Sequence, residues 1–265
     1  MVKSVEEIEL IRNSSLLVSK TLAELAGHIK LGITALDLDK IAEEFIRDHG
    51  AEPGFKGYGG FPNTLCFSMN DQVVHGIPGN TVLKEGDVLS IDCGTLWNNY
   101  YGDQAFTFAM AGVSEEVLKL LRVTRKSLDL GIEQAVVGKR VGDIGFAIQQ
   151  YCEREHSYGV VRELVGHGLG KNLHEDPEVP NYGKKGQGVR LQENMVLAIE
   201  PMINLGVRNV RTADDGWTVI TRDGKVSAHY EHDVVVKKDK AEVLTDFSII
   251  DKAISKNKEL QEIVE

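Results

Sequence analysis

The sequence has no hydrophobic run long enough to cross a membrane. No stretch of the 265 residues approaches the roughly 18 consecutive apolar residues that a transmembrane helix needs, so we expect no membrane partner. The opening segment, MVKSVEEIEL, is acidic where a secretory signal peptide would be basic and then apolar, which favours a cytoplasmic protein. Lysine and arginine total 30 against 40 acidic residues, and the net charge of −10 argues against nucleic acid as a partner.

Cysteine is also scarce. Cys66, Cys93 and Cys152 lie far apart in the chain, and their spacing matches no CxxC zinc or redox motif. We therefore expect three reduced thiols that pack as small buried hydrophobes. No Pro-rich or Ser-rich linker divides the chain, and its length allows a full core without disulfides.

Hydrophobic periodicity predicts helices that alternate with short strands. The first helix is expected over 4–29, where Ser4 and Glu7 have the spacing of a capping box. Further helices are expected over 36–46, 114–135, 138–153 and 246–265. Strand-like runs lie at 73–74, 88–93 and 105–108.

Three pairs of segments indicate an internal duplication, because they follow one another in the same order at a nearly constant offset. Segment 32–47 resembles segment 138–153. The motif HGIP at 75–78 is echoed by HEDP at 174–177, and LKEGDVLSID at 83–92 is echoed by LQENMVLAIE at 191–200. We therefore expect two similar halves, approximately 1–112 and 113–240, followed by a tail over 241–265. A cleft at the seam between such halves is a common place for a site.

The repeat aligns two carboxylates, Asp92 and Glu200, at the ends of strand-like runs. A buried carboxylate is unfavourable unless it is paired or binds a metal ion, so two at matched positions indicate a functional site. Asp103 follows Asp92 at a spacing that fits a hairpin returning one carboxylate beside the other.

Two further candidates lie in the second half. His167 stands within GHGLG, where glycines allow close backbone approach, and Glu231 stands within AHYEHDVVV. Each candidate also has a plainer interpretation, as a turn aspartate, a packed histidine or a polar strand residue. The pattern alone does not choose Glu231 over its neighbours His229, His232 and Asp233.

Taken together, the motifs resemble those of the methionine aminopeptidases. They are VVHGIP, SIDCG, YYGDQAFTF, GHGLG followed after three residues by HEDP, MVLAIEPMI, DGWTV and SAHYEHDVVV. The segment between His167 and Glu200 is too short for the large helical insertion of the type II enzymes, and no zinc-finger extension is present, as in the short bacterial-style type I form. The resemblance implies an α+β, pseudo-twofold pita-bread fold, a mainly antiparallel curved sheet covered by helices, in a single catalytic domain over 1–265.

The resemblance also implies a centre of two divalent metal ions. Its ligands would be Asp92, Asp103, His167, Glu200 and Glu231. In that scheme Asp92 and Asp103 bind one ion, Asp103 and Glu231 bridge the two, and His167 and Glu200 complete the other. Mostly oxygen donors suit Co, Mn, Fe(II) or Zn without selecting among them. The family acts through a hydroxide that bridges the two ions.

By the same resemblance, His75 would contact the scissile amide nitrogen and His174 the carbonyl oxygen, while Glu200 would shuttle the proton. The implied function is removal of the initiator methionine from nascent polypeptides when the second residue is small. A prolidase-like, proline-specific aminopeptidase and a noncatalytic peptide-binding module of the same fold are the alternatives. We expect a monomer that meets nascent N-termini and, transiently, the ribosome.

The family's methionine pocket maps to residues for which core packing is the plainer interpretation. They are Tyr58, Phe61, Cys66, Leu173 and Trp217. Phe55 and Leu173 depart from the residues usual at the pocket wall, and Gln104 departs from the usual Ser or Thr after Asp103. The last departure concerns a hydrogen bond behind the metal ligands rather than a ligand itself.

Overall fold

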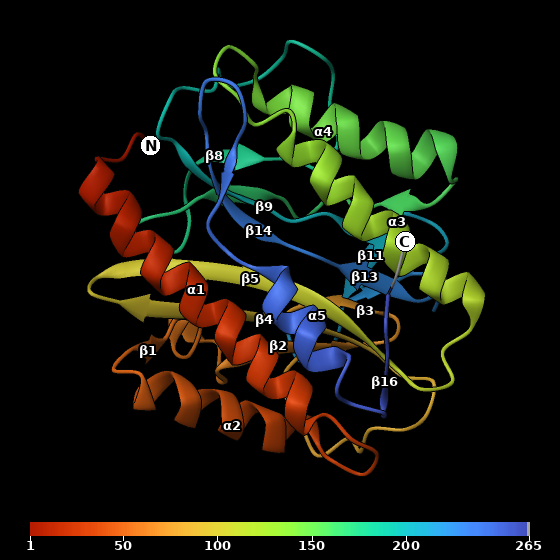
Figure 1. Ribbon diagram of the computed structural model, residues 1–265. Helices are drawn as coiled ribbons and strands as arrows, with labels where there is room; N and C mark the ends of the chain where they lie inside the picture. The colour runs from red at the N-terminus through yellow and green to blue at the C-terminus, as the bar shows by residue number, and fades with distance from the viewer. Residues whose placement is uncertain (264–265) are drawn as a thin grey trace.

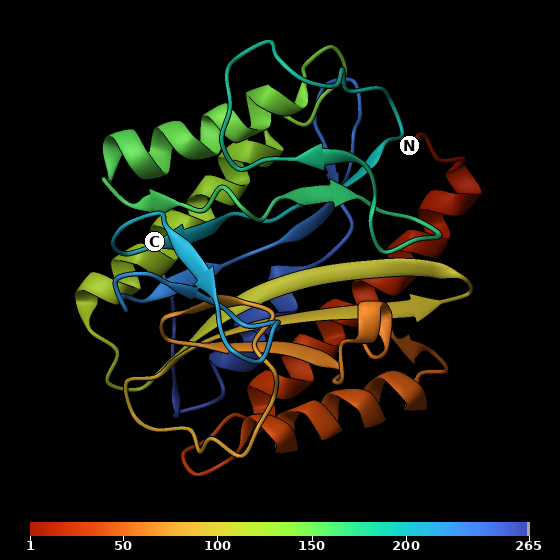
Figure 2. The ribbon, with the colours of Figure 1, turned by 180° about the vertical axis from the view of Figure 1, so that it is seen from behind.

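The computed structural model describes residues 1–263 and has antiparallel sheets with helices packed against them (Figure 1). The helices are α1 (Val5–His28), α2 (Ala35–Asp48), α3 (Glu115–Ile132), α4 (Val141–Gln149) and α5 (Phe247–Ile254), with a 3-10 turn η1 (Tyr58–Gly60) and a π-helical segment η2 (Gln150–Glu155). In the opposite view the strands lie in front of the long helices (Figure 2). This arrangement confirms the expected α+β class.

Two five-stranded sheets form the centre of the molecule. The first contains β1 (Glu52–Pro53), β2 (Leu65–Met69), β4 (Val88–Trp97), β5 (Tyr100–Met110) and β16 (Leu260–Gln261). The second contains β7 (Gly166–Gly168), β8 (Glu175–Val179), β9 (Val196–Ile199), β14 (His232–Val235) and β15 (Glu242–Val243). Two three-stranded sheets contain β3 (Gln72–Val74), β11 (Val210–Thr212) and β12 (Val219–Thr221), and β6 (Gly159–Val160), β10 (Met202–Asn204) and β13 (Ser227–His229).

The first helix begins as its sequence predicts and lies unusually close to the sheet. Ser4 Oγ accepts the amide of Glu7 at 3.2 Å, and Glu7 Oε2 accepts the amide of Ser4 at 2.9 Å, so the capping box is confirmed. Where α1 crosses β5, a Cβ atom on Gly102 would lie only 2.3 Å from the backbone nitrogen of Ser15. Glycine is therefore what allows α1 to approach the sheet at this point.

The sequence repeat has a structural counterpart at the starts of α2 and α4. The amide of Thr34 donates to Asp37 in the first turn of α2, and the amide of Arg140 donates to Asp143 in the first turn of α4. The sequence repeat aligns Thr34 with Arg140. The same two residues form antiparallel bridges with Val82 and Arg190, which directly precede the aligned segments 83–92 and 191–200. On this basis we propose that the segments 1–112 and 113–240 are equivalent halves of one domain.

The main core lies between the helices and both five-stranded sheets. Phe106 of β5 is fully buried and packs edge-on against Phe247 of α5, with ring centroids 5.0 Å apart. Burial of aromatic side chains of this size contributes about 2–3 kcal/mol each. The three cysteines are free and buried, as predicted. In the described part of the chain, no helix is long and apolar enough to cross a membrane.

The helix expected over 246–265 is wrong in its extent. Helix α5 ends at Ile254, and the chain then turns to form β16, where Leu260 pairs with Met110 of β5. The turn is fixed by Asn257, whose side chain donates at 2.7 Å to the carbonyl oxygens of Ala26 and Ile29 at the end of α1. These hydrogen bonds hold the chain in a turn where the sequence predicts that the helix continues. Residues 264–265 lie outside the described part.

Candidate metal centre and its pocket

The β4–β5 hairpin brings the two aspartates of the first half together. Asp92 pairs with Ala105 and Gly94 pairs with Asp103, so the aspartates occupy diagonal positions on neighbouring strands. The hairpin expected from their spacing is therefore present. Side chains at such diagonal positions lie close enough to interact across a strand pair.

The second half supplies the other candidate ligands from the second sheet and from the ends of its strands. His167 lies in β7 and pairs with Ala198 of β9, while Glu200 directly follows β9. Glu231 directly precedes β14, and its amide donates to the carbonyl oxygen of Ala105 at 3.0 Å. That hydrogen bond joins the two sheets at the point where their acidic residues meet.

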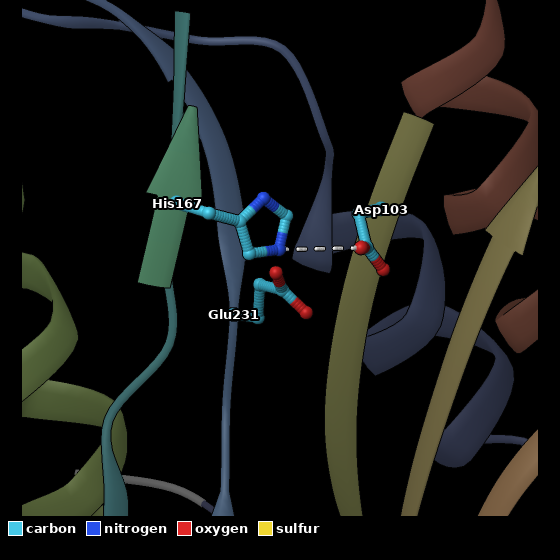
Figure 3. Close-up of side chains that lie close together, drawn as sticks. All are labelled: Asp103, His167 and Glu231. Carbon is cyan, nitrogen blue, oxygen red and sulfur yellow. Dashed lines mark ion pairs between the residues drawn. The ribbon is translucent and has the colours of Figure 1, made fainter. Parts of the chain in front are cut away.

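The five residues form one buried cluster. One ligand atom each of Asp103, His167 and Glu231 lies within 4.8 Å of the others (Figure 3). His167 Nε2 lies 3.8 Å from Asp103 Oδ2 and 3.7 Å from Glu200 Oε1. Asp92 lines the same cavity as these four residues. All five candidate ligands therefore face one space.

Burial disfavours the charged forms of the residues in this cluster, and the carboxylates also repel one another. Burial, reinforced by Glu200, raises the pKa of Asp92 to about 7, and burial raises the pKa of Glu200 to about 8. The pKa values of Asp103 and Glu231 are raised well above their ordinary range by burial and by the neighbouring carboxylates. Burial lowers the pKa of His167 to about 4, so this imidazole is neutral near pH 7.

The cluster fits divalent cations. Among the described residues, Asp92 Oδ1, Asp103 Oδ1 and Glu231 Oε1 are buried without a hydrogen-bond partner. Buried polar atoms of this kind normally have partners, and several of them converging on one space indicate an ion. Four carboxylates and one neutral imidazole are donors that first-row divalent metals accept, and their negative charge offsets that of the ions.

Two more histidines border the cavity, as the sequence indicated. His174 stacks edge-on against His167 with ring centroids 4.3 Å apart, and its Nδ1 lies 2.9 Å from the hydroxyl oxygen of Tyr58. His75 has a φ of +58°, which is uncommon for a residue with a side chain and is typical of functional positions. Both imidazoles line the same cavity as the carboxylates.

An apolar chamber continues from the carboxylates. The cavity has a volume of about 260 Å³. Its walls include all the residues expected for the pocket, namely Tyr58, Phe61, Cys66, Leu173 and Trp217, together with Phe55. Phe61 packs edge-on against Trp217 at 5.2 Å between ring centroids. The sequence did not indicate Leu164, Val165 and Met202, which also line it; Met202 follows Glu200 by two residues, and the other two lie in a loop.

The structure separates Glu231 from the neighbours that the sequence could not exclude. Glu231 lines the cavity, whereas His232 Nδ1 lies 2.6 Å from Thr245 Oγ1 on the side of α5. Asp233 Oδ2 accepts the amide of Asp103 at 2.9 Å and lies behind that residue. His229 is buried beside Glu200, and neither it nor Asp233 is among the residues that line the cavity.

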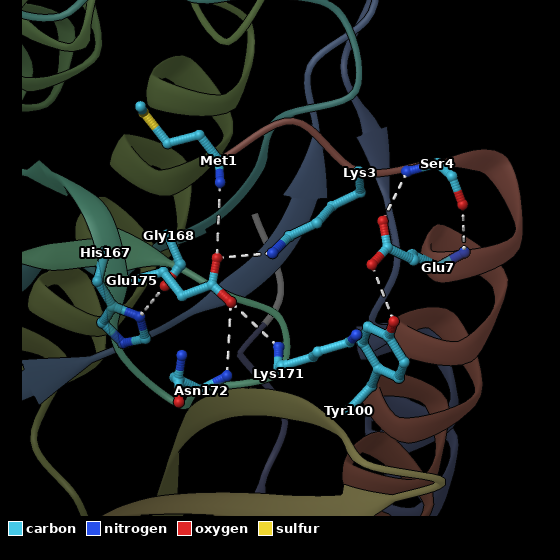
Figure 4. A network of polar contacts seen from close by, with 10 residues as sticks. All are labelled: Met1, Lys3, Ser4, Glu7, Tyr100, His167, Gly168, Lys171, Asn172 and Glu175. Atoms are coloured by element: carbon cyan, nitrogen blue, oxygen red, sulfur yellow. Dashed lines mark hydrogen bonds and ion pairs between the residues drawn. The ribbon is translucent and has the colours of Figure 1, made fainter.

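A polar network outside the cavity fixes the loop that carries His174 (Figure 4). Glu175 Oε2 accepts Lys3 Nζ at 2.6 Å, and Glu175 Oε1 accepts the amide of Lys171 at 3.0 Å. Lys3 is largely buried, so this charge-assisted bond is partly shielded from water. The segment that precedes α1 thereby holds a residue of the candidate active site in place.

Known proteins are similar to this chain in sequence and in structure. The model of "Metallopeptidase family M24" matches residues 9–238. A methionine aminopeptidase of Clostridium perfringens is 51% identical over 245 residues, which cover 92% of this chain and 98% of that protein. The crystal structure of methionine aminopeptidase from Rickettsia prowazekii has a TM-score of 0.91 and 38% identity, covering 93% of this chain and 99% of that one.

The proline-specific alternative has weaker support. An X-Pro aminopeptidase from Thermotoga maritima has a TM-score of 0.75 but 23% identity, and the match covers 93% of this chain and 62% of that one. That likeness shows the fold alone, which is the expected pita-bread fold. With the buried carboxylates in place and relatives matched along nearly their full length, the chain belongs to metallopeptidase family M24 and, within it, to the methionine aminopeptidases.

Proposed function

We propose that this chain releases methionine from the N-terminus of nascent polypeptides whose second residue is small. One observation carries the proposal: a single cavity joins the buried cluster of carboxylates to an apolar chamber. The cluster supplies the chemistry at the scissile bond, and the chamber supplies recognition of the side chain that is released. The relatives that match along nearly the whole chain are methionine aminopeptidases.

The metal centre in this proposal is dinuclear. Its ligands are Asp92, Asp103, His167, Glu200 and Glu231, which would hold two divalent ions drawn from Co, Mn, Fe(II) and Zn. When bound, the ions would acidify a water molecule and polarise the scissile carbonyl. The protein's part is to hold five buried donors in one cavity, so that little reorganisation is needed when the ions bind.

Glu200 is the proposed base. It follows β9 directly, and Asn181 Nδ2 donates to its carbonyl oxygen at 3.0 Å, so its backbone is held on both sides. Its carboxylate faces the cavity, where it can take the proton of the attacking water and return it to the leaving amine.

His174 and His75 are proposed to act on the scissile peptide. When the Tyr58 hydroxyl donates to His174 Nδ1, the proton of the neutral imidazole is on Nε2, which can donate to the carbonyl oxygen and to the oxyanion that forms from it. Burial lowers the pKa of His75 to about 4, so a neutral imidazole faces the amide nitrogen. Both roles depend on their positions at the border of the cavity.

The chamber determines the specificity that we propose. A thioether is unbranched and polarizable and suits a chamber walled by Phe61, Cys66 and Trp217. A charged side chain would lose its hydration there without gaining a partner. The two histidines beside the scissile bond leave room only for a small residue after the methionine.

The compartment and partners follow from this substrate. Nascent N-termini are exposed where chains leave the ribosome, so the proposal includes action in the cytoplasm and a transient ribosome contact. We also propose that the chain acts as a monomer.

Peptide hydrolysis by the metal-loaded protein tests the function. Met-Ala-Ser and its norleucine analogue should be cleaved, whereas Met-Leu-Ser and Lys-Ala-Ser should be poor substrates. Comparable rates for Met-Ala-Ser and Met-Leu-Ser would refute the steric argument, and faster cleavage of Ala-Pro-Ala would establish the prolidase-like alternative. Glu200→Gln should leave the fold intact and remove most activity; turnover within about threefold of wild type at saturating metal would exclude Glu200 as the base.

A further inference from the structure

His229 is a buried imidazole that the mechanism above does not use. It ends β13, opposite Met202 of β10, and its side chain is 1% exposed. Among the residues that the structure describes, neither of its ring nitrogens has a hydrogen-bond partner. A fully buried histidine without partners is uncommon and requires an explanation.

The backbone holds this residue firmly. Thr107 Oγ1 accepts the amide of His229 at 2.9 Å and donates to its carbonyl oxygen at 2.7 Å. Ser90 Oγ in turn lies 2.9 Å from Thr107 Oγ1. The first sheet therefore fixes the position from which the imidazole extends.

The imidazole lies beside the proposed base. His229 Nε2 is 3.4 Å from Glu200 Oε2, whereas Glu200 Oε1 is 3.7 Å from His167 Nε2. The two oxygens of the carboxylate therefore face two different imidazoles. His167 lines the cavity and His229 does not, so the contact with His229 lies behind the carboxylate.

His229 can supply one hydrogen bond to that carboxylate. A neutral imidazole carries a single N–H, on one of its two ring nitrogens. A proton on Nε2 meets the acceptor Oε2, whereas a proton on Nδ1 would be buried without an acceptor among the described residues. The tautomer with the proton on Nε2 is therefore favoured. At 3.4 Å the contact is longer than a hydrogen bond, and contacts of this kind commonly tighten into hydrogen bonds when a catalytic site is loaded.

We propose that His229 is a positioning residue for Glu200, donating from Nε2 to Oε2 so that Oε1 is directed at the metal and the attacking water. The inference rests on the proposed function only in making Glu200 a ligand and base. A ligating carboxylate that is held by a second hydrogen bond cannot rotate away, and loss of such a partner typically lowers metal affinity or activity by about 10–100-fold.

Three variants test this role. His229→Leu removes both ring nitrogens and leaves a side chain of similar volume. In His229→Gln the side-chain amide can still donate to Glu200 from a similar distance along the side chain. Tyr230→Phe is the matched control, because Tyr230 is also fully buried and its hydroxyl donates to the carbonyl oxygen of Thr107 at 2.9 Å, away from the cavity. For each protein we would measure Mn²⁺ affinity by calorimetry, and kcat and KM on Met-Ala-Ser at saturating Mn²⁺.

His229→Leu should lower Mn²⁺ affinity and kcat by about 10–100-fold with little change in KM, and His229→Gln should restore most of both. Tyr230→Phe should lower only the melting temperature. A kcat and an affinity for His229→Leu within about twofold of wild type, or equal defects in the Leu and Gln variants, would overturn the proposal.

If His229→Leu does not fold, His229→Asn replaces it, because its shorter amide does not reach Glu200; equal behaviour of Asn and Gln would then overturn the proposal. If the wild-type protein binds Mn²⁺ but cleaves no peptide, the proposed function fails, and the affinity comparison still decides the role of His229.

Discussion

Removing metal should make the stability of this protein fall as the pH rises above 6.5. A carboxyl group whose pKa is raised on folding binds more protons in the folded state, so the free energy of unfolding falls as pH rises from its unfolded to its folded pKa. The pKa of Glu200 is raised from 4.5 to about 8 by burial, and the pKa values of Asp103 and Glu231 are raised well above their ordinary range. Deprotonation of all three groups is therefore less favourable in the metal-free folded state than in the unfolded chain.

The buried histidines have the opposite effect, but only at lower pH. Burial lowers the pKa values of His167, His75 and His229 from 6.5 to about 4, so they stabilise the fold increasingly as pH rises toward 6.5 and contribute no further change above it. Between pH 6.5 and 8.5 the carboxyl groups act alone. Glu200 titrates over about 1.5 pH units of this interval, and its titration lowers the free energy of unfolding by about 2 kcal/mol.

Thermal unfolding at a series of pH values measures this effect. For a chain of this length, about 2 kcal/mol corresponds to a fall in melting temperature of roughly 4–8 °C. The metal-free protein should show this fall between pH 6.5 and 8.5, and Mn²⁺ should abolish it, because the ions bind the deprotonated carboxylates. Glu200→Gln should reduce the slope of the metal-free protein. Equal slopes with and without Mn²⁺ would refute the interpretation of the cluster as a metal centre.

Three further predictions concern the scaffold around the site. Asp39 Oδ1 accepts the buried amides of Thr64 and Leu65 at 2.9 and 2.8 Å, directly after the segment that carries Tyr58 and Phe61 of the pocket. Asp39→Ala should therefore lower the free energy of unfolding by about 2–3 kcal/mol and raise KM for Met-Ala-Ser more than it lowers kcat; an unchanged KM would contradict this role. Gly102→Ala should lower the free energy of unfolding in urea by about 3 kcal/mol, because the new Cβ atom would lie 2.3 Å from the backbone of α1. Gly27→Ala is the control: Gly27 lies in α1 with nothing within 4 Å of the position of a Cβ atom, so this change should be neutral or stabilising. Lys3→Met should lower kcat several-fold, because it removes the bond between Lys3 and Glu175 that holds the loop carrying His174. Kinetics equal to wild type would show that this bond does not position the loop.

The sequence predicted those features that local rules and the repeat determine. The capping box of Ser4 and Glu7 depends on a short local spacing, and the diagonal placement of Asp92 and Asp103 on neighbouring strands depends on the length of a hairpin. The two sides of the cavity, by contrast, come from segments far apart in the chain. No local pattern brings Leu164 and Val165 to the pocket or places Lys3 on Glu175.

Two failures have a common physical cause. The sequence could not choose among the residues 229–233 because strand alternation there is interrupted: β13 ends at His229 and β14 begins at His232, and the two belong to different sheets. The end of α5 was likewise missed because it is determined by the side chain of Asn257 binding carbonyl oxygens on a distant helix. In both places tertiary contacts override the local pattern.

The pairing of β16 with β5 has a consequence for how the chain folds during synthesis. Leu260 and Gln261 cover the end of the β5 edge at Met110 and Ala109, which lie far upstream in the chain. Until that segment leaves the ribosome, this end of β5 is unpaired, and an unpaired strand edge is a template for pairing with other chains. The first sheet is therefore completed only after the second has been made. Nascent or truncated chains that lack residues 247–261 should consequently be more prone to aggregate and to need chaperones than complete ones.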